Sequence, residues 1–430
     1  MHVLVLGAGV TGLTTAYCLA RDGHTVTVLD REQGAGLGAS YANGGQLSYS
    51  YVAPLASPGA LRDLPFWLLD RNSPLRFRPQ IDPHQWRWCL RFLMACTGRQ
   101  SRRATEHLLT LALYSRALME KTVAETGLEF AHTRTGKLVV YSSEAGLRGA
   151  VAQMRFQEQF GCEQRALDTA ACLEIEPALA HIRDRLAGGI FTPSEQAGDC
   201  HRFCTGLESR LRSPACGVTF AYGQTASRFV CDRERVLAVE TGQGTIEADA
   251  YVLALGTGSR ALARTAGFDL PIYPLKGYSL SVPVRTPAAA PSVSVTDHAR
   301  KIVYARLGDK LRIAGMADLV GYGRDLDEER LALLIREAKS AFPEASDYRR
   351  VEPWCGLRPA TPTSMPIIGS TPKSNLLVNV GHGALGFTLA MGTARVIGDL
   401  AAGKQPAIPL DGFALPHRGG AAGTAFAVAS

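Results

Sequence analysis

Three glycines near the start of the chain have the spacing of a turn that binds a nucleotide. Gly7, Gly9 and Gly12 form a Gly-x-Gly-x-x-Gly set directly after the apolar residues 3–6. In such turns the first glycine permits the tight turn, the second lets the backbone approach a pyrophosphate, and the third lets helix and strand pack closely. Asp30 follows 23 residues after Gly7, where a carboxylate accepts hydrogen bonds from a ribose diol and repels a 2′-phosphate. These residues predict a site for NAD or FAD.

The segment after this acid favours FAD. NAD dehydrogenases continue into another strand here, whereas residues 31–48 contain five glycines and several polar side chains, among them Arg31, Ser40, Asn43, Gly44 and Gly45. Glycines permit the close approach of a backbone to a flat ring. The segment resembles the second conserved block of glutathione-reductase-like flavoproteins, although an ordinary turn loop has a similar composition.

A second set of chemically capable residues lies near the other end of the chain. Arg358 stands in a Gly-Leu-Arg-Pro sequence that we interpret as a glycine-rich turn, where its guanidinium can bind a carboxylate through two parallel hydrogen bonds. A surface ion pair is the alternative for this arginine. Glycines at 381, 383 and 386 precede a helix whose start can point at an electron-rich group. His382 between them either contacts the cofactor or simply packs.

The elements that must position these residues alternate in type. Residues 2–6 predict a buried strand, residues 10–20 a helix ended by Gly23, and residues 24–29 a second strand. Further helices are expected at 101–126, 201–212 and 327–342. Strands are expected at 134–141 and 218–222, in a hairpin and buried strand within 235–256, and as short alternating strands within 276–316.

This order predicts an α/β protein with a discontinuous nucleotide domain and an inserted substrate domain. We expect the nucleotide domain at 1–53, 195–265 and 346–415, and the substrate domain at 54–194 and 266–345. The low-complexity residues 416–430 are expected to be a disordered tail.

Bulk properties exclude several classes of protein. The 430 residues carry a net charge of +7 without a basic stripe, which argues against a nucleic-acid partner and is compatible with anionic substrates or an anionic membrane surface. The ten cysteines and ten histidines lack zinc spacing, so we expect no metal. No signal peptide or membrane-spanning run is visible, which predicts a cytoplasmic protein. Trp67, Trp86 and Trp88, with Arg87 and Arg91, fit either an aromatic core or a surface docked on a membrane.

The glycine set together with "SYANGGQLS", "ADAYVLALG", "YPLKGYSLSVP", "GLRPATPTSMPIIG" and "GHGALGFTLA" resembles the D-amino-acid dehydrogenase small-subunit family of the D-amino-acid oxidase and glycine oxidase superfamily. The blocks occur in family order and extend to about residue 410. The resemblance implies a glutathione-reductase-like Rossmann FAD domain, an inserted α+β substrate domain with an antiparallel sheet, and FAD bound non-covalently, since the C-terminal glycine block lacks the cysteine that links flavin in sarcosine oxidases.

The resemblance also implies roles for individual residues. Arg358 matches the arginine that grips the substrate carboxylate, and Tyr273 and Tyr278 fall near carboxylate-binding or lid tyrosines, although they fit a core as well. Lys276 is interpreted as close to the flavin or paired with a solvent-facing acid. The residues implied to hold FAD are Gly7, Gly9, Gly12, Asp30, Arg31, Ser40, Asn43, Gly44, Gly45, Ala226, Gly256, Gly383, Leu385, Gly386, Phe387 and Thr388.

The expected reaction is oxidation of a D-amino acid to a 2-oxo acid and ammonia by hydride transfer from Cα to flavin N5. The resemblance implies a respiratory electron acceptor, a quinone or another carrier, and contact with the cytoplasmic face of the inner membrane is compatible with it. Three alternatives stay open: a D-proline or D-hydroxyproline dehydrogenase, a glycine- or sarcosine-type oxidase, and a redox-silent nucleotide sensor.

Overall fold

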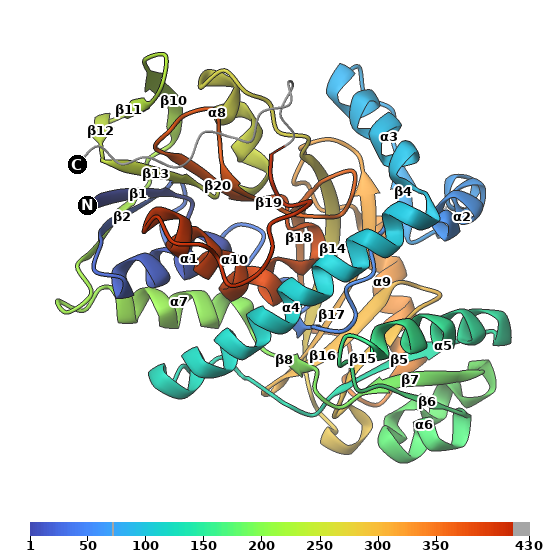
Figure 1. The fold of residues 1–430 in the computed structure, drawn as a ribbon. Helices are drawn as coiled ribbons and strands as arrows, with labels where there is room; N and C mark the ends of the chain where they lie inside the picture. The colour runs from blue at the N-terminus through green and yellow to red at the C-terminus, as the bar shows by residue number, and fades with distance from the viewer. Residues whose placement is uncertain (71–72, 416–430) are drawn as a thin grey trace.

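Two large β-sheets organise the chain in a computed structural model that describes residues 1–70 and 73–415 (Figure 1). The side chains of 66–69 are outside this description, and with them that of Trp67. The expectation of a disordered tail at 416–430 also falls outside the described residues. The first sheet carries the nucleotide-binding turn, and the second faces it across the cavity described below.

The first sheet has six strands, and its central strands are parallel. In spatial order they are β19 (Ile367–Ser370), β20 (Leu376–Val380), β13 (Ala250–Leu253), β1 (His2–Leu6), β2 (Thr25–Asp30) and β9 (Val218–Tyr222), with only β19 antiparallel to its neighbour. Strands from the beginning, the middle and the end of the sequence thus lie side by side, which confirms the expected discontinuous Rossmann domain.

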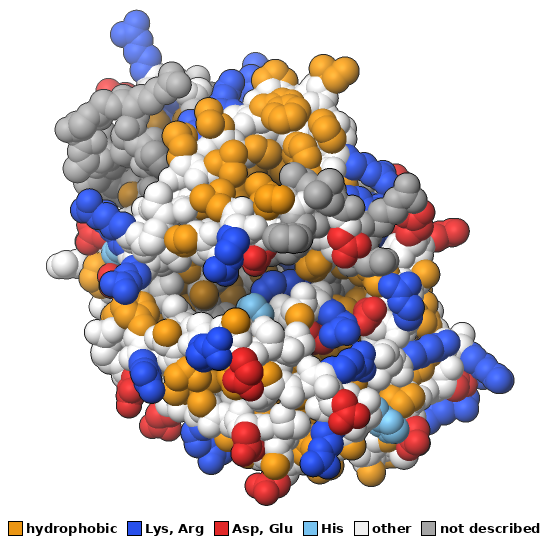
Figure 2. All heavy atoms as spheres, turned by 90° about the vertical axis from the view of Figure 1, so that its right-hand side faces the viewer, with side chains coloured by type: hydrophobic (Ala, Val, Ile, Leu, Met, Phe, Trp, Pro, Cys, Tyr) orange, Lys and Arg blue, Asp and Glu red, His pale blue; other side chains and the backbone are white. Residues whose placement is uncertain are grey.

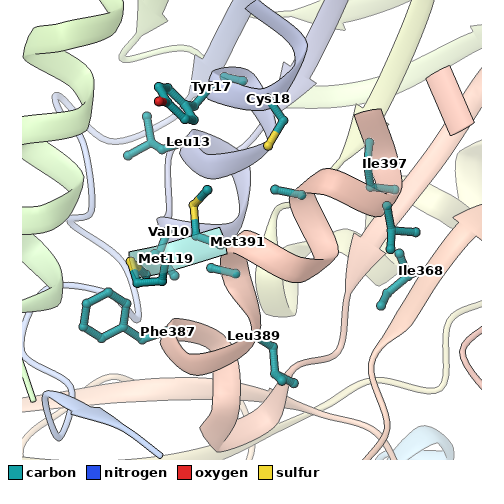
Figure 3. Close-up of a cluster of buried hydrophobic side chains, with 14 of the residues drawn as sticks. Val10, Leu13, Tyr17, Cys18, Met119, Ile368, Phe387, Leu389, Met391 and Ile397 are labelled. Atoms are coloured by element: carbon teal, nitrogen blue, oxygen red, sulfur yellow. The ribbon is translucent and has the colours of Figure 1, made fainter. Parts of the chain in front are cut away.

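Alternation along β1 gives this sheet two buried faces. Val3 and Val5 face helices, whereas Leu4 and Leu6 face a three-stranded antiparallel sheet. The helices are α1 (Val10–Arg21), α7 (Cys200–Leu211) and α10 (Gly386–Ala401); the small sheet is β10 (Ala226–Cys231), β11 (Val236–Thr241) and β12 (Gly244–Glu247), beside α8 (Ser259–Thr265). Figure 3 shows the buried cluster around α1 and α10, with Leu13 and Cys18 on α1 and Met391 and Ile397 on α10.

The second sheet has nine strands and mixed pairing. Its path is β18 (Glu352–Ala360), β14 (Tyr273–Pro283), β17 (Lys310–Leu319), β16 (Ile302–Leu307), β15 (Ser294–Asp297), β5 (Lys137–Tyr141), β7 (Gly188–Thr192) and β6 (Arg165–Leu167), with β4 (Leu75–Phe77) also on β17. Three helices pack beside this sheet (Figure 1): α5 (Glu144–Glu158), α6 (Thr169–Ile175) and α9 (Glu328–Ala341). This is the predicted α+β domain, and its sheet is mostly antiparallel, with β15–β5 and β17–β4 as parallel pairs.

Helix α4 (Gly98–Thr126) runs across the front of the molecule in the view of Figure 1. Its 29 residues span about 44 Å. It packs against α10, and Ser115 Oγ donates a hydrogen bond of 2.6 Å to the Thr388 carbonyl. The residues before it form α2 (Pro58–Leu69) and α3 (Pro83–Ala95), and a two-stranded ribbon joins β3 (Gln46–Leu47) to β8 (Gln196–Ala197).

Most predicted elements are present, with ends that differ by a few residues. The helix expected from 101 begins at Gly98, because Thr97 caps it by accepting a hydrogen bond from the Gln100 amide. The expectation of short strands at 276–316 is wrong for β14, which runs unbroken for 11 residues because it is buried on both faces.

One predicted turn is a strand. The segment around Arg358 is β18, paired with β14 in continuous antiparallel register from Tyr273–Ala360 to Ser281–Glu352. An edge strand tolerates the prolines at 353 and 359, which made the segment look like a turn. The third expected nucleotide segment, 346–415, therefore contributes a strand to the second sheet.

No helix in the described ranges is both long and apolar enough to cross a bilayer.

Candidate active site

A cavity of about 1380 Å³ lies where the two large sheets meet. The carboxyl ends of β1, β2, β13 and β20 open onto it, as expected for the binding edge of a parallel sheet. Residues of β14, β17 and β18 form the opposite wall. Its volume exceeds the ~300–1,000 Å³ typical of sites for drug-sized molecules. A dinucleotide together with a small substrate fits such a space.

The glycine turn shapes the first wall through its backbone. Gly7 has φ +116°, and a Cβ there would stand 2.5 Å from the Ala254 carbonyl oxygen. Gly9 precedes α1 and lines the cavity. Gly12 does not line it: a Cβ at this position would overlap the Gly7 carbonyl oxygen, so its role is the close packing of helix on strand.

Asp30 joins the end of β2 to this turn. Its Oδ2 accepts a 2.6 Å hydrogen bond from the Ala8 amide, and its Oδ1 accepts one of 2.9 Å from the Glu32 amide. The carboxylate therefore has a fixed orientation at the cavity wall, which Arg31 also lines. This geometry fits the recognition of a ribose diol.

The polar segment that follows is held against both sheets. Ser40 Oγ accepts a 3.0 Å hydrogen bond from the Val10 amide at the start of α1. Asn43 Oδ1 accepts one from the Gly45 amide, and Arg312 Nη1 donates one of 2.8 Å to the Asn43 carbonyl. A Cβ on Gly44 would lie 3.0 Å from a Val303 methyl carbon. These residues of the segment line the cavity.

The start of α10 closes the same end of the cavity. Gly383, Leu385, Gly386, Phe387 and Thr388 all line it, and a helix N-terminus favours an electron-rich group. Thr388 Oγ1 accepts a 3.1 Å hydrogen bond from the Ser48 amide, which ties this helix to the glycine-rich segment. Ala226 and Gly256 also line the cavity.

Arg358 projects from β18 into the opposite wall. Its Nη1 donates a 2.7 Å hydrogen bond to the Met316 carbonyl. A Cβ on Gly277, in the neighbouring strand, would overlap the guanidinium, so this glycine provides the space for it. Desolvation lowers the pKa of Arg358, and the negative charge of Asp318 raises it. The cation is half-buried and faces the cavity.

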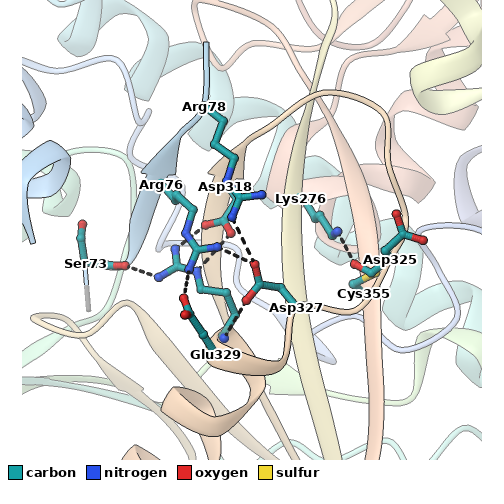
Figure 4. A network of polar contacts seen from close by, with 10 residues as sticks. Ser73, Arg76, Arg78, Lys276, Asp318, Asp325, Asp327, Glu329 and Cys355 are labelled. Atoms are coloured by element: carbon teal, nitrogen blue, oxygen red, sulfur yellow. Dashed lines mark hydrogen bonds and ion pairs between the residues drawn. The ribbon is translucent and has the colours of Figure 1, made fainter. Parts of the chain in front are cut away.

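Asp318 belongs to a buried network behind this wall (Figure 4). Arg330 donates from Nε to Asp318 Oδ2 at 3.1 Å and forms an ion pair with the same carboxylate, and both side chains are 1% exposed. Arg330 Nη1 also donates a 2.7 Å hydrogen bond to the Ser73 carbonyl. The network fixes the acid whose charge favours the protonated Arg358.

The structure brings only some of the other expected residues to the cavity. Tyr278 and His382 line it; Tyr273 and Lys276 do not. Tyr273 is fully buried among His84, Trp88 and Tyr322. Lys276 extends from the face of β14 that also carries the Tyr278 ring, whose centroid is 5.5 Å from Lys276 Nζ, and it donates to the Asp325 carbonyl (Figure 4).

His382 is a neutral side chain in this wall. It is 4% exposed, and desolvation lowers its pKa to about 3. Its Nε2 lies 3.3 Å from Thr393 Oγ1. Burial also raises the pKa of Tyr278 above its ordinary value, so its hydroxyl stays protonated.

The sequence analysis did not identify two residues of the cavity wall, Met316 and Lys137. Met316, which accepts the bond from Arg358, has φ +66°, a conformation that is uncommon for residues other than glycine. Lys137 is 2% exposed and donates to Gln46 Oε1 and Ser48 Oγ; desolvation lowers its pKa to about 8. No sequence pattern marks either residue, because both depend on strands that are distant in the chain.

Sequence comparisons identify a family of enzymes to which this chain is similar. A family model described as FAD dependent oxidoreductase matches residues 2–400. The protein named D-amino acid dehydrogenase 2 of Ralstonia nicotianae is 49% identical over 425 residues, covering 96% of this chain and 100% of the relative. The Pseudomonas aeruginosa protein of the same name is 46% identical and covers 98% and 99%.

Solved structures share the fold at lower identity. Glycine oxidase from Geobacillus kaustophilus superposes with a TM-score of 0.78 at 23% identity, covering 97% of this chain and 99% of that one. L-proline dehydrogenase from P. horikoshii has a TM-score of 0.73 at 17% identity and covers 96% of each.

Proposed function

Because the chain belongs to the family of FAD-dependent oxidoreductases, as its resemblance predicted, we propose that it oxidises D-amino acids to 2-oxo acids and ammonia. The observation that carries the proposal is the guanidinium of Arg358, which faces the cavity opposite the glycine-rich wall. The dehydrogenase names of relatives at 40–49% identity support the same substrate class.

FAD fits the first wall on structural grounds. The glycine turn leaves the cavity free of side chains where a pyrophosphate would lie, Asp30 presents a fixed carboxylate, and the start of α10 supplies a positive end. When bound, FAD would supply the acceptor for the two electrons and the hydrogen that leave the substrate Cα. The cavity-lining members of the predicted cofactor set would hold it, and we propose that it is bound non-covalently.

Arg358 would bind the substrate carboxylate. One edge of its guanidinium is committed to the Met316 carbonyl, so the group cannot rotate freely. Two parallel hydrogen bonds from an anchored guanidinium fix the carboxylate plane and therefore the direction of the Cα–H bond. Such positioning supplies much of the barrier reduction in a reaction between two held partners.

The neighbouring side chains favour this binding mode. His382 is buried and neutral, so it adds no positive charge to this wall of the cavity. The ammonium must lose a proton before hydrogen leaves Cα, and the resulting imine reacts with water to give the 2-oxo acid and ammonia. The electrons would pass to a respiratory carrier such as a quinone, with the protein at the cytoplasmic face of a membrane.

Anaerobic bleaching of the flavin tests the proposal. Purified holoprotein is mixed without oxygen with individual D-amino acids, including D-proline and cis-4-hydroxy-D-proline, and flavin absorbance is followed. We expect bleaching by D-amino acids and not by their L-enantiomers or by D-amino acid amides. Bleaching by none of the acids would overturn the proposed function, and bleaching by the cyclic acids alone would narrow it to an imino-acid dehydrogenase.

A further inference from the structure

Lys137 is a buried cation in the cavity wall that the proposed function does not use. It lies on β5, is 2% exposed, and lines the cavity. Four strands separate β5 from β18 in the second sheet, so about 24 Å of sheet lies between Lys137 and Arg358 at roughly 4.8 Å per strand. A carboxylate bound by Arg358 is therefore not shared with Lys137, which faces a different part of the contents of the cavity.

Three cavity-lining side chains hold the ammonium group of this lysine. Lys137 Nζ donates hydrogen bonds of 3.0 Å to Gln46 Oε1 and of 2.9 Å to Ser48 Oγ, and it lies 4.1 Å from the centroid of the Tyr51 ring. Gln46 is oriented for this contact, because its Nε2 donates a 2.6 Å hydrogen bond to Ser294 Oγ and its Oε1 remains for Lys137. The segment 46–51 thus fixes the position of Nζ.

The ammonium group keeps one hydrogen for a bound molecule. It has three hydrogens, and the described residues accept two of them. Burial lowers the pKa of Lys137 to about 8, and the negative charge of Glu195 opposes this fall, so the charged form predominates at pH 7. Glu195 Oε1 accepts a 2.6 Å hydrogen bond from the Ser50 amide, and Glu195 is not among the residues that line the cavity. The positive charge therefore faces the cavity, and the negative charge lies behind its wall.

The start of α10 adds positive potential at the same end of the cavity. Ser48 connects the two features, because its Oγ accepts the hydrogen bond from Lys137 and its amide donates one of 3.1 Å to Thr388 Oγ1. Helix α10 has 16 residues and begins at Gly386, and a helix N-terminus carries a partial positive charge. A charged side chain and a helix end thus converge on one part of the cavity.

The acidic side chains of the cavity wall lie on other segments. Among the described residues they are Asp30 and Glu32, at and just after the end of β2, and Asp63 on α2. Figure 2 shows the molecule hollowed on the side that carries α2 and α5, with basic side chains at the edge of the hollow. Lys137 is nearly inaccessible to water, so dissolved ions screen its charge less than they screen the charges at this edge.

The proposed reaction creates negative charge inside the cavity. When hydride leaves Cα, the hydrogen departs with both electrons of its bond, and the lone pair of the neutral amine forms the C=N bond. The substrate becomes an iminium cation and the acceptor gains one negative charge. Fixed positive groups that face the acceptor stabilise it more after this transfer than before it.

We propose that Lys137 contacts the electron-rich edge of the bound flavin through its third N–H and stabilises the negative charge of the reduced ring. The inference rests on the proposed function, since it requires FAD as the hydride acceptor. Gln46, Ser48 and Tyr51 are then positioning residues for Nζ. An acidic substrate side chain is a weaker candidate for this contact, because a D-glutamate held by Arg358 is much shorter than the stretch of sheet that separates the two cations.

The midpoint potential of bound FAD tests the proposal without any amino acid substrate. The holoprotein and its variants are reduced stepwise with dithionite, without oxygen, beside a dye of known potential. Lys137→Met and Lys137→Gln both remove the charge, so one serves if the other does not fold, and Lys137→Arg keeps it. Lys310→Met is the matched control, because Lys310 lies at the start of β17, pairs with Glu352 and is not among the residues that line the cavity.

We expect both neutral variants to lower the equilibrium constant for flavin reduction about 10- to 100-fold, which is about 30–60 mV for a two-electron couple. A unit charge a few ångströms away at an effective dielectric constant of about 20 is sufficient for this effect. Lys137→Arg should stay closer to the unchanged protein, and Lys310→Met should equal it. The Kd for oxidised FAD should change less than the reduction equilibrium, because the oxidised ring is uncharged.

An unchanged midpoint potential in both neutral variants would overturn the proposal, even if the melting temperature fell, because a merely structural lysine affects folding alone. An equal fall in Lys137→Arg would also overturn it. A higher KM confined to acidic D-amino acids, with an unchanged potential, would assign Lys137 to the substrate side chain. A potential that depends on Lys137 in a protein whose flavin no D-amino acid bleaches would refute the proposed function and leave the flavin contact standing.

Discussion

The cavity wall formed by residues 7–45 and the wall that carries Arg358 are built in different ways. The first wall uses backbone amides and glycines that are close in sequence, held by bonds such as Ala8 N–H to Asp30. The second uses side chains from β14, β17 and β18, which hydrogen bonds and cross-strand pairs bring together. The local wall tolerates few changes at Gly7, Gly12 and Gly45, because a Cβ at these positions would meet backbone atoms, whereas the assembled wall can shift its side chains.

The strongest test of this difference is Gly12→Ala. A methyl group at this position would overlap the Gly7 carbonyl oxygen, so α1 must move away from β1. Overpacking of this kind costs about 1–3 kcal/mol or more, and here it also distorts the nucleotide turn. We expect a lower melting temperature and loss of most bound FAD. Gly242→Ala, in open space on a surface turn, is the control and should leave both unchanged. Normal FAD content in Gly12→Ala would show that the first wall is as adaptable as the second.

Arg358→Lys tests the second wall. Lysine keeps the charge but lacks the fork that holds a carboxylate at two points. Loss of one bidentate pair should cost about 3 kcal/mol of transition-state stabilisation, a fall of about a hundredfold in kcat/KM for D-amino acids. FAD content should stay normal because the glycine turn is untouched. Unchanged kcat/KM, or loss of flavin in place of activity, would assign Arg358 a structural role.

Asp30→Ala tests the first wall by removing a side chain, so it creates no steric overlap with neighbouring atoms. It removes the carboxylate proposed to bind the ribose, and hydrogen bonds to a charged group contribute about 1.5–3 kcal/mol. The Kd for FAD, measured by flavin fluorescence on the apoprotein, should rise about 10- to 100-fold. Asp30→Asn should retain part of the affinity. An unchanged Kd in the alanine variant would exclude the ribose contact.

Gly277→Ala should have the smallest effect. The added methyl group meets the far end of the Arg358 side chain, which can move, so the fold and FAD content should persist. A displaced guanidinium should raise the KM for D-amino acids by roughly tenfold, because part of the carboxylate binding is lost. Steady-state kinetics of Gly277→Ala and of the Gly242→Ala control, measured with the same D-amino acids, quantify this change in KM. A loss of folded protein would instead show that the second wall is as rigid as the first.

The sequence could predict the elements whose signals are local. The strand, turn and helix of residues 2–21 and the acid at 30 follow one another within 30 residues, so periodicity and spacing identify them. The helices at 98–126, 200–211 and 328–341 carry the same kind of periodic signal, and residues 218–222 form the expected strand. The resemblance singled out Arg358 as a candidate site residue, and Arg358 lines the cavity, although the sequence predicted a turn where the structure has the strand β18.

Only the tertiary structure decided which distant residues meet. Tyr273 and Lys276 are neighbours of cavity residues in sequence, yet one is buried under α3 and the other donates to the Asp325 carbonyl. Met316 and Lys137 reach the cavity with no local signal. Their positions follow from a sheet order, β18-β14-β17-β16-β15-β5, in which β15 pairs with β5, more than 100 residues earlier in the chain. A side chain in such a sheet gains its partners from strand pairing and burial, and neither is encoded by the residues beside it in the chain.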